Sequence, residues 1–129
     1  MAIAQPRPDL AAHERAVRTP FPELVEQLRS LLGARLTAYL GAVKETRAVH
    51  EWVSGERTPS ELTQHRLRTA LQVAIVVADA DGPTVAQAWF QGLNPQLEDR
   101  SPARLLREGD LDEVGPAVIA AGRAFLVGG

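Results

Sequence analysis

One long helix with an apolar second half constrains the fold of this chain more than any other feature. Between Ala70 and Ala78 every residue except Gln72 is apolar, and apolar residues continue upstream at helical spacing. A capping-box pattern with Thr58 as the N-cap predicts that this helix spans Pro59–Ala80. Because a helix that is apolar on nearly all sides has to be buried, we expect the rest of the chain to pack around it.

The remaining sequence also shows the period of a helix. No segment alternates between apolar and polar residues with a period of two, and the composition is rich in Ala and Leu, which favour helix. We therefore predict an all-α fold of roughly seven helices. The other helices are expected at residues 22–33, 35–40, 44–53, 83–91 (with Val85, Ala88 and Trp89 inward and Phe90 as a further candidate), 101–109 and 110–129. Gly115-Pro116 is expected to kink the last helix or to delay its first turn.

The N-terminal residues 1–21 are predicted to form a flexible arm. Three prolines, Pro6, Pro8 and Pro20, fall there and the apolar spacing is weak, although a short helix at Leu10–Val17 is an alternative. Two regions follow the arm. We expect a helix-turn-helix region at residues 22–69 and a second helical domain at residues 70–129.

Composition and charge favour an intracellular, non-secreted protein. The chain has no cysteine, no apolar run of the roughly 20 residues that span a bilayer, and no apolar signal segment near its start, so we expect a cytoplasmic location. The net charge is −2. Residues 1–68 hold ten Lys and Arg against eight Asp and Glu, whereas residues 69–129 hold four against eight. A weakly basic half followed by an acidic half predicts two different roles.

Catalytic motifs are lacking in the sequence. His13, His50 and His65 are not spaced as a metal-binding pair on a helix, and there is neither a nucleophile elbow nor a glycine-rich phosphate loop. Paired carboxylates such as Asp112-Glu113 stand at helix starts, where the helix dipole explains them. We therefore expect no enzymatic activity, no metal and no cofactor.

The stretch Leu36–Pro59 has the layout of a helix-turn-helix, with two short helices and a tight turn at Gly41-Ala42. On a helical wheel centred on Val49, the buried face of the second helix includes Trp52, Val53 and Thr46. The opposite face is polar and consists of Arg47, Glu51 and Ser54, flanked by Lys44 and His50.

Side chains of several polar types are what base reading in the major groove requires. Arg47 can bind guanine through two hydrogen bonds, while Lys44 and Arg57 are placed for phosphate contacts. Glu51 can accept from a cytosine amine or orient Arg47. The candidate DNA-binding residues are Lys44, Thr46, Arg47, His50, Glu51, Ser54 and Arg57. The same pattern also fits an ordinary solvated helix face.

A cluster of the form W-x-S-G-x-x-x-P, made by Trp52, Ser54, Gly55 and Pro59, follows Val49 in the second of these helices. Together with Leu40 and Gly41, this pattern resembles the helix-turn-helix of the Xre regulator family. The turn at residues 41–43 is longer than is usual in that family, which affects the register of the reading residues. The resemblance implies a DNA-binding regulator.

The C-terminal half carries a second set of motifs. These are Trp89-Phe90, Asn94-Pro95-x-Leu97, Arg100-x-Pro102-x-x-Leu105-Leu106, an acidic turn with glycine, and a last helix that ends in Phe125. Their order and spacing resemble the toxin-binding domain of the Xre/MbcA/ParS antitoxins. With the helix-turn-helix ahead of it, this resemblance covers most of the chain and leaves out the N-terminal arm.

The resemblance implies a type II antitoxin. The family partner is a RES-domain toxin that depletes cellular NAD, and the antitoxin binds it through the C-terminal domain, whose end blocks the toxin's active site. The helix-turn-helix represses the shared operon. The candidate toxin-binding residues are Arg104, Arg107, Phe125, Leu126, Val127, Gly128 and Gly129.

The apolar residues at the chain end are suited to anchoring in a concave pocket, and Arg104 and Arg107 to meeting an acidic partner. As an alternative, Phe125 and Leu126 pack into this protein's own core instead of contacting a partner. We expect Trp89 to be a core residue as well. The expected partners are a RES-domain toxin and operator DNA, with a homodimer or a hetero-oligomer as the assembly. The alternative function is a stand-alone Xre-type regulator whose C-terminal half only oligomerises.

Overall fold

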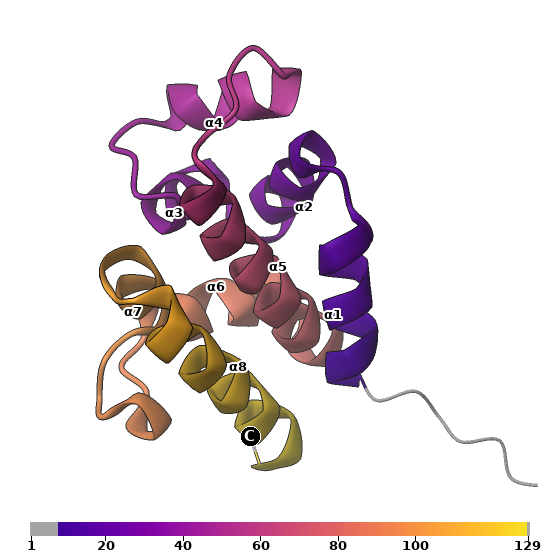
Figure 1. Cartoon of the computed structure of the whole chain (residues 1–129). Coiled ribbons are helices and arrows are strands. Elements are labelled where there is room, and N and C mark those ends of the chain that lie inside the picture. Colours follow the sequence, from indigo (N-terminus) through magenta and orange to yellow (C-terminus); the bar gives the residue numbers. More distant parts are fainter. Residues whose placement is uncertain (1–7, 129) are drawn as a thin grey trace, which may run out of the picture.

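The computed structural model of the chain describes residues 8–128, which are folded almost entirely as helix (Figure 1). Within this range there is no strand, and the only β-type pairing is an isolated bridge between Asn94 and Arg100. The all-α prediction is confirmed. The helices of the described part are α1 (Pro8–Arg18), α2 (Phe21–Leu32), α3 (Ala34–Leu40), α4 (Thr46–Ser54), α5 (Glu61–Asp81), α6 (Pro83–Gln91), the 3-10 helix η1 (Pro95–Leu97), α7 (Pro102–Glu108) and α8 (Leu111–Gly128).

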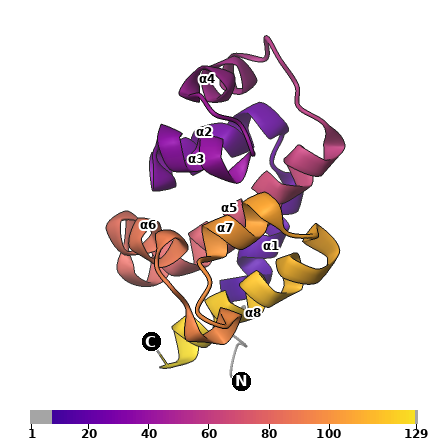
Figure 2. The same ribbon diagram turned by 90° about the vertical axis from the view of Figure 1, so that its left-hand side faces the viewer.

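Helix α5 is the centre of the molecule, as its apolar run predicts. All residues from Ala70 to Val77 are buried, and α5 packs against α1, α2, α6 and α8. Figure 2 shows α2, α3 and α4 on one side of α5 and α6 and α8 on the other, with α7 drawn in front of α5. The expected boundary between residues 69 and 70 falls inside α5, so both regions share one helix. No helix among residues 8–128 is long and apolar enough to cross a membrane.

The N-cap of α5 differs from the sequence prediction. Ser60, not Thr58, caps the helix, and its Oγ accepts a hydrogen bond from the backbone N–H of Thr63 at 3.3 Å. Pro59 stays outside the helix, where its carbonyl accepts from the side-chain amide of Gln64 at 3.1 Å. Thr58 and Ser60 are both residue types that can cap a helix. The helix starts after Ser60 because its hydroxyl accepts from a backbone N–H of the first turn that has no partner within the helix.

At the N-terminal segment the structure has the alternative, a helix that is longer than the expected Leu10–Val17, in place of a flexible arm. Helix α1 lies against α5 with Ala12 and Ala16 buried, since their small side chains allow the two helices to approach closely. Arg68 of α5 donates to the carbonyls of Ala16 and Thr19, both at 2.9 Å. These partners are far apart in sequence, which explains why local spacing did not indicate them. Residues 1–7 lie outside the described part of the chain.

Helix α6 buries the further candidate Phe90 but is otherwise rotated relative to the prediction that Val85, Ala88 and Trp89 point inward. Its buried residues are Ala86 and Phe90, while Trp89 is half-buried and packs edge-on against Phe90 with ring centroids 5.2 Å apart. Residues four apart share a helix face, so burying the large ring of Phe90 together with Ala86 turns Val85 toward solvent.

The residues before the last two helices cap them. Ser101 caps α7 by accepting from the N–H of Arg104 at 3.1 Å. Asp110 accepts from the N–H of Asp112 at 3.1 Å, and α8 then begins directly at Leu111. The expected delay at Pro116 does not occur, because Pro116 lies inside α8.

Candidate functional site

Helices α3 and α4 are joined by a compact turn at residues 41–43. The N–H of Gly41 donates to Thr37 at 3.0 Å, and the N–H of Val43 donates to Ala38 at 3.1 Å. A Cβ atom on Gly41 would lie 2.8 Å from the ring of Trp52, a separation that real Cβ atoms do not show. Glycine is therefore required here, because it lets the end of α3 touch the buried face of α4.

The inner face of α4 is the one that the helical wheel predicts. Val49 and Trp52 are buried, and Trp52 packs edge-on against Phe21 of α2 with ring centroids 6.3 Å apart. Thr46 and Val53 are half-buried beside them. The helix ends at Gly55, which has the left-handed conformation expected of a C-cap glycine.

The outer face of α4 is organised by Glu51. Its carboxylate accepts from Arg47 Nε at 2.9 Å and from Arg57 Nη1 at 3.4 Å. The Glu51 side chain is only 16% exposed, whereas that of Arg47 is 84% exposed. Of the two roles considered for Glu51, orienting Arg47 is the one that this geometry performs. The structure thus brings together Arg47, Glu51 and Arg57.

The other candidates of this region surround that cluster. His50 is exposed and its Nδ1 lies 3.0 Å from Nη1 of Arg29 on α2, which is also paired with Glu26. Ser54 is exposed and donates to the carbonyl of Glu51 at 3.1 Å. Lys44 is exposed before the start of α4, and Thr46 shares a groove with it.

The end of α8 is partly in the core and partly exposed. Phe125 and Leu126 are half-buried and pack against the hydrophobic core. Val127 is 91% exposed and Gly128 is exposed as well. Gly129 lies outside the described residues. The end of α8 therefore leaves an apolar side chain in solvent after two residues that close the core.

An apolar groove of about 560 Å³ lies beside this end, between α6, the loop before η1 and α8. No charged side chain lines it. Its lining residues, which we call the C-terminal groove, are Val85, Ala88, Trp89, Gly92, Leu93, Asn94, Pro95, Gln96, Ala121, Ala124, Phe125 and Gly128. Leu93 is 76% exposed and was not among the predicted toxin-binding residues. The signal that could have identified it is its place in a Gly-Leu-Asn-Pro turn, where a large apolar side chain has no helix face to bury it.

The two candidate arginines of α7 have different surroundings. Arg104 is exposed and its Nε donates to Glu108 at 3.0 Å, a bond that raises the pKa of Arg104. Arg107 points inward, where Nη1 donates to the carbonyls of Tyr39 at 2.8 Å and Val43 at 3.4 Å. Arg107 is therefore a link between α7 and the α3–α4 turn.

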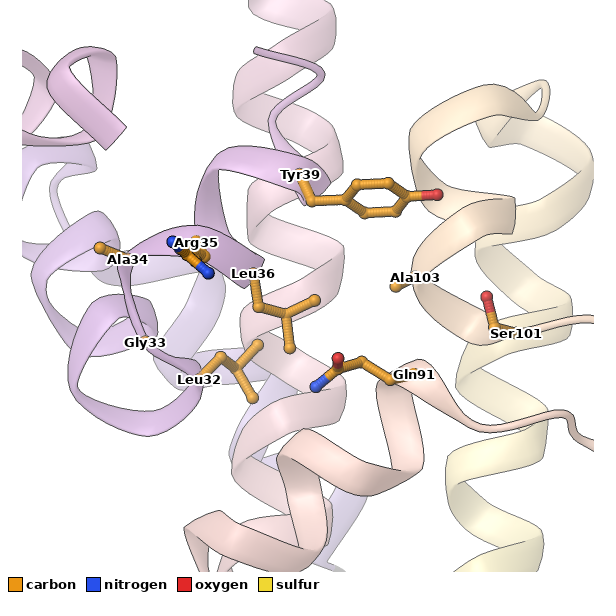
Figure 3. A pocket seen from close by; sticks show the side chains of 9 residues that line it. All are labelled: Leu32, Gly33, Ala34, Arg35, Leu36, Tyr39, Gln91, Ser101 and Ala103. Carbon is orange, nitrogen blue, oxygen red and sulfur yellow. The ribbon is translucent and has the colours of Figure 1, made fainter. Parts of the chain in front are cut away.

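A larger groove of about 710 Å³ separates α3 from the end of α6 and the start of α7 (Figure 3). Tyr39 and Leu36 face it from α3, with Gln91 and Ser101 on the opposite wall. The groove is a seam between the two halves of the chain. Among residues 8–128, no group of three or more His, Cys, Asp or Glu side chains is arranged to hold a metal ion.

The chain is homologous to the bacterial antitoxin MbcA, and its fold is similar to that of a chain in a toxin-antitoxin complex. The relatives are the proteins named Mycobacterial cidal antitoxin MbcA of Mycobacterium tuberculosis and Mycobacterium bovis, which are 34% identical to it over 68 residues. The match spans 53% of this chain and 60% of the length of those relatives, less than two thirds. No family model matches the sequence.

The structural comparison extends the match. A chain of the crystal structure of the M. tuberculosis MbcT-MbcA toxin-antitoxin complex superposes with a TM-score of 0.61 and 26% sequence identity. This match covers 80% of the present chain and 94% of the other. The similarity in fold therefore includes most of α1–α8.

Proposed function

We propose that this chain is a type II antitoxin that binds a RES-type, NAD-depleting toxin, blocks its active site, and represses its own operon. The observation that carries the proposal is the double match to MbcA, in sequence and in a fold taken from a toxin-antitoxin complex. As an intracellular regulator it would act in the cytoplasm without catalysing a reaction.

The C-terminal region, residues 70–129, is the proposed toxin-binding part. Exposed apolar side chains are otherwise scattered over the described surface, but Leu93 and Val85 both line the C-terminal groove. An apolar groove with exposed anchors at its rim supports association with a protein surface, since buried apolar anchors dominate the affinity of such interfaces. Arg104 and Phe125–Gly129 remain the proposed contacts of this region.

The region at residues 22–69 is the proposed DNA-binding part, with α3 and α4 as its helix-turn-helix. Arg47, Ser54 and Arg57 are exposed on one side of α4 and are suited to contacts with bases and phosphates, with Lys44, Thr46 and His50 around them. A homodimer reading two half-sites is the arrangement that operator recognition favours.

Co-expression with each product of the neighbouring genes tests the antitoxin proposal. A stable complex in size-exclusion chromatography with light scattering, together with restored NAD levels in cells that express the partner, is the expected result. If neither neighbour associates with the chain, the protein is a stand-alone Xre-type regulator whose C-terminal half oligomerises it.

The variant Arg47→Ala tests DNA reading by α4. If Arg47 binds a guanine through two hydrogen bonds, discrimination between operator and random DNA falls by about 1–3 kcal/mol. Equal weakening on both duplexes would show that Arg47 contacts only phosphate. Fluorescence anisotropy with two labelled duplexes, one from upstream of the gene and one scrambled, distinguishes these results.

A further inference from the structure

A second groove, next to the one in Figure 3, collects positive charge at the start of α4. We infer that it binds a phosphate of the DNA backbone, so that the DNA contact surface reaches from α4 across to α7. We call it the cationic groove. It has a volume of about 360 Å³ and is lined by Arg35, Ala38, Tyr39, Val43, Lys44, Thr46 and Arg107.

Three cations and no carboxylate line the cationic groove. The groove beside α1 is a contrast, since Arg15 and Arg18 share it with Glu14 and Glu23. An unbalanced concentration of positive charge in a concave surface attracts an anionic ligand.

The cations of this groove also lack acidic partners elsewhere in the described part of the chain. Most other arginines of residues 8–128 pair with a carboxylate, namely Arg15, Arg29, Arg47, Arg57, Arg100, Arg104 and Arg123. Arg35 and Lys44 are exposed and form no such pair. Their charges are thus available to a ligand without first breaking an ion pair.

Arg107 forms the inner wall of the groove and keeps a fixed position. Its Nη1 donates to the carbonyls of Tyr39 and Val43, and its guanidinium lies over the Tyr39 ring at 4.6 Å from the centroid. Neither carbonyls nor an aromatic ring neutralise the charge. A cation held in place beside two exposed ones is suited to a phosphate, which accepts several charge-assisted hydrogen bonds.

The position of the groove selects DNA among phosphate-bearing ligands. Lys44 and Thr46 belong both to this groove and to the proposed DNA-binding region, whose reading face follows directly along α4. A phosphate bound here would therefore flank the bases contacted by Arg47. This inference rests on the proposed DNA binding and extends it to Arg35 of α3 and Arg107 of α7.

The test uses the full chain, the same two labelled duplexes, and the variants Arg35→Gln and Lys44→Gln. Arg18→Gln is the matched control, because Arg18 is also exposed and forms no ion pair among the described residues. Binding is measured by anisotropy from roughly 50 to 300 mM salt. Each groove variant is expected to bind both duplexes about tenfold more weakly. Each also lowers the salt slope by about one, since one phosphate contact is lost.

The outcomes separate this inference from the proposed function. If the wild-type chain binds DNA and the groove variants bind it with unchanged affinity and slope, the groove lies outside the DNA contact surface and the inference is overturned alone. If the wild-type chain binds neither duplex, both are overturned. A third outcome is tested by titrating the full chain with inorganic phosphate and monitoring the amide chemical shifts of residues 43–46. Saturable binding there, without any effect of the variants on DNA, overturns the inference by assigning the groove to a free anion instead.

Discussion

The guanidinium of Arg107 stacks on the ring of Tyr39 while its Nη1 donates to the carbonyl of the same residue at 2.8 Å. One side chain of α7 thereby holds the last turn of α3 by two kinds of contact. A further bond to the carbonyl of Val43, at 3.4 Å, extends this hold to the residue that leads into α4. The two halves of the chain are joined at the turn that sets the direction of α4.

Replacing Arg107 by alanine is expected to lower the free energy of unfolding by about 2 kcal/mol, because two carbonyls and a cation–π contact lose their partner. Urea denaturation followed by tryptophan fluorescence measures this. The matched control is Arg104→Ala on the same helix, whose surface pair with Glu108 contributes little. Equal stability of the two variants would contradict the role of Arg107 as a link.

The variant Gly41→Ala is expected to destabilise the protein by about 1–3 kcal/mol, because its Cβ would lie 2.8 Å from the Trp52 ring and overpack the helix contact. The neighbouring variant Ala42→Gly is the control with the opposite sign. Ala42 has a φ of 60°, so glycine there relieves strain and raises stability by about 0.5 kcal/mol. Thermal unfolding curves measure the stability of both variants. A Gly41→Ala protein as stable as the wild type would contradict the close contact between Gly41 and the Trp52 ring.

Glu51→Gln is expected to strengthen binding to DNA of any sequence several-fold and to reduce discrimination between operator and scrambled duplex. The carboxylate of Glu51 holds both Arg47 and Arg57, so its removal frees two cations and takes a negative charge away from the phosphates. Glu56→Gln serves as the control, since Glu56 is exposed next to the same cluster and pairs with no cation among residues 8–128. Anisotropy titrations distinguish the two, and weaker DNA binding by Glu51→Gln would refute the expectation.

Deleting residues 125–129 is expected to abolish neutralisation of the toxin while DNA binding is kept, because α4 lies on the opposite side of α5 from the end of α8 (Figure 2). Neutralisation is measured as survival and NAD content of cells expressing the partner. Retained neutralisation would place the interface elsewhere in residues 70–124.

The point variant Leu93→Ser tests the C-terminal groove without shortening a helix. We expect it to weaken the toxin complex about tenfold, since truncating an apolar anchor that becomes buried in an interface costs about 1–2 kcal/mol. Leu10→Ser is matched to it, because Leu10 is exposed on α1 rather than in the groove. Isothermal titration calorimetry with the purified partner measures the affinity of each variant. Equal affinities of Leu93→Ser and Leu10→Ser would show that the groove takes no part in binding.

The sequence determined what local chemistry and periodicity control. The apolar run at Ala70–Ala78 was sufficient to predict the buried central helix. The wheel centred on Val49 identified the buried face of α4 for the same reason, since a helix places residues three and four apart on one side. The motif resemblance to antitoxins belongs here as well.

Only the tertiary structure decided the contacts between residues distant in the chain. The docking of α1 depends on Arg68 and Arg123, which lie far from it in sequence, and so local patterns left both a flexible arm and a short helix open for this segment. The inward turn of Arg107 depends on carbonyls of α3 and of the turn after it. The cationic groove arises because folding brings Arg35, Lys44 and Arg107 together. Such proximity follows from how the helices pack around α5, and no local pattern in the sequence encodes it.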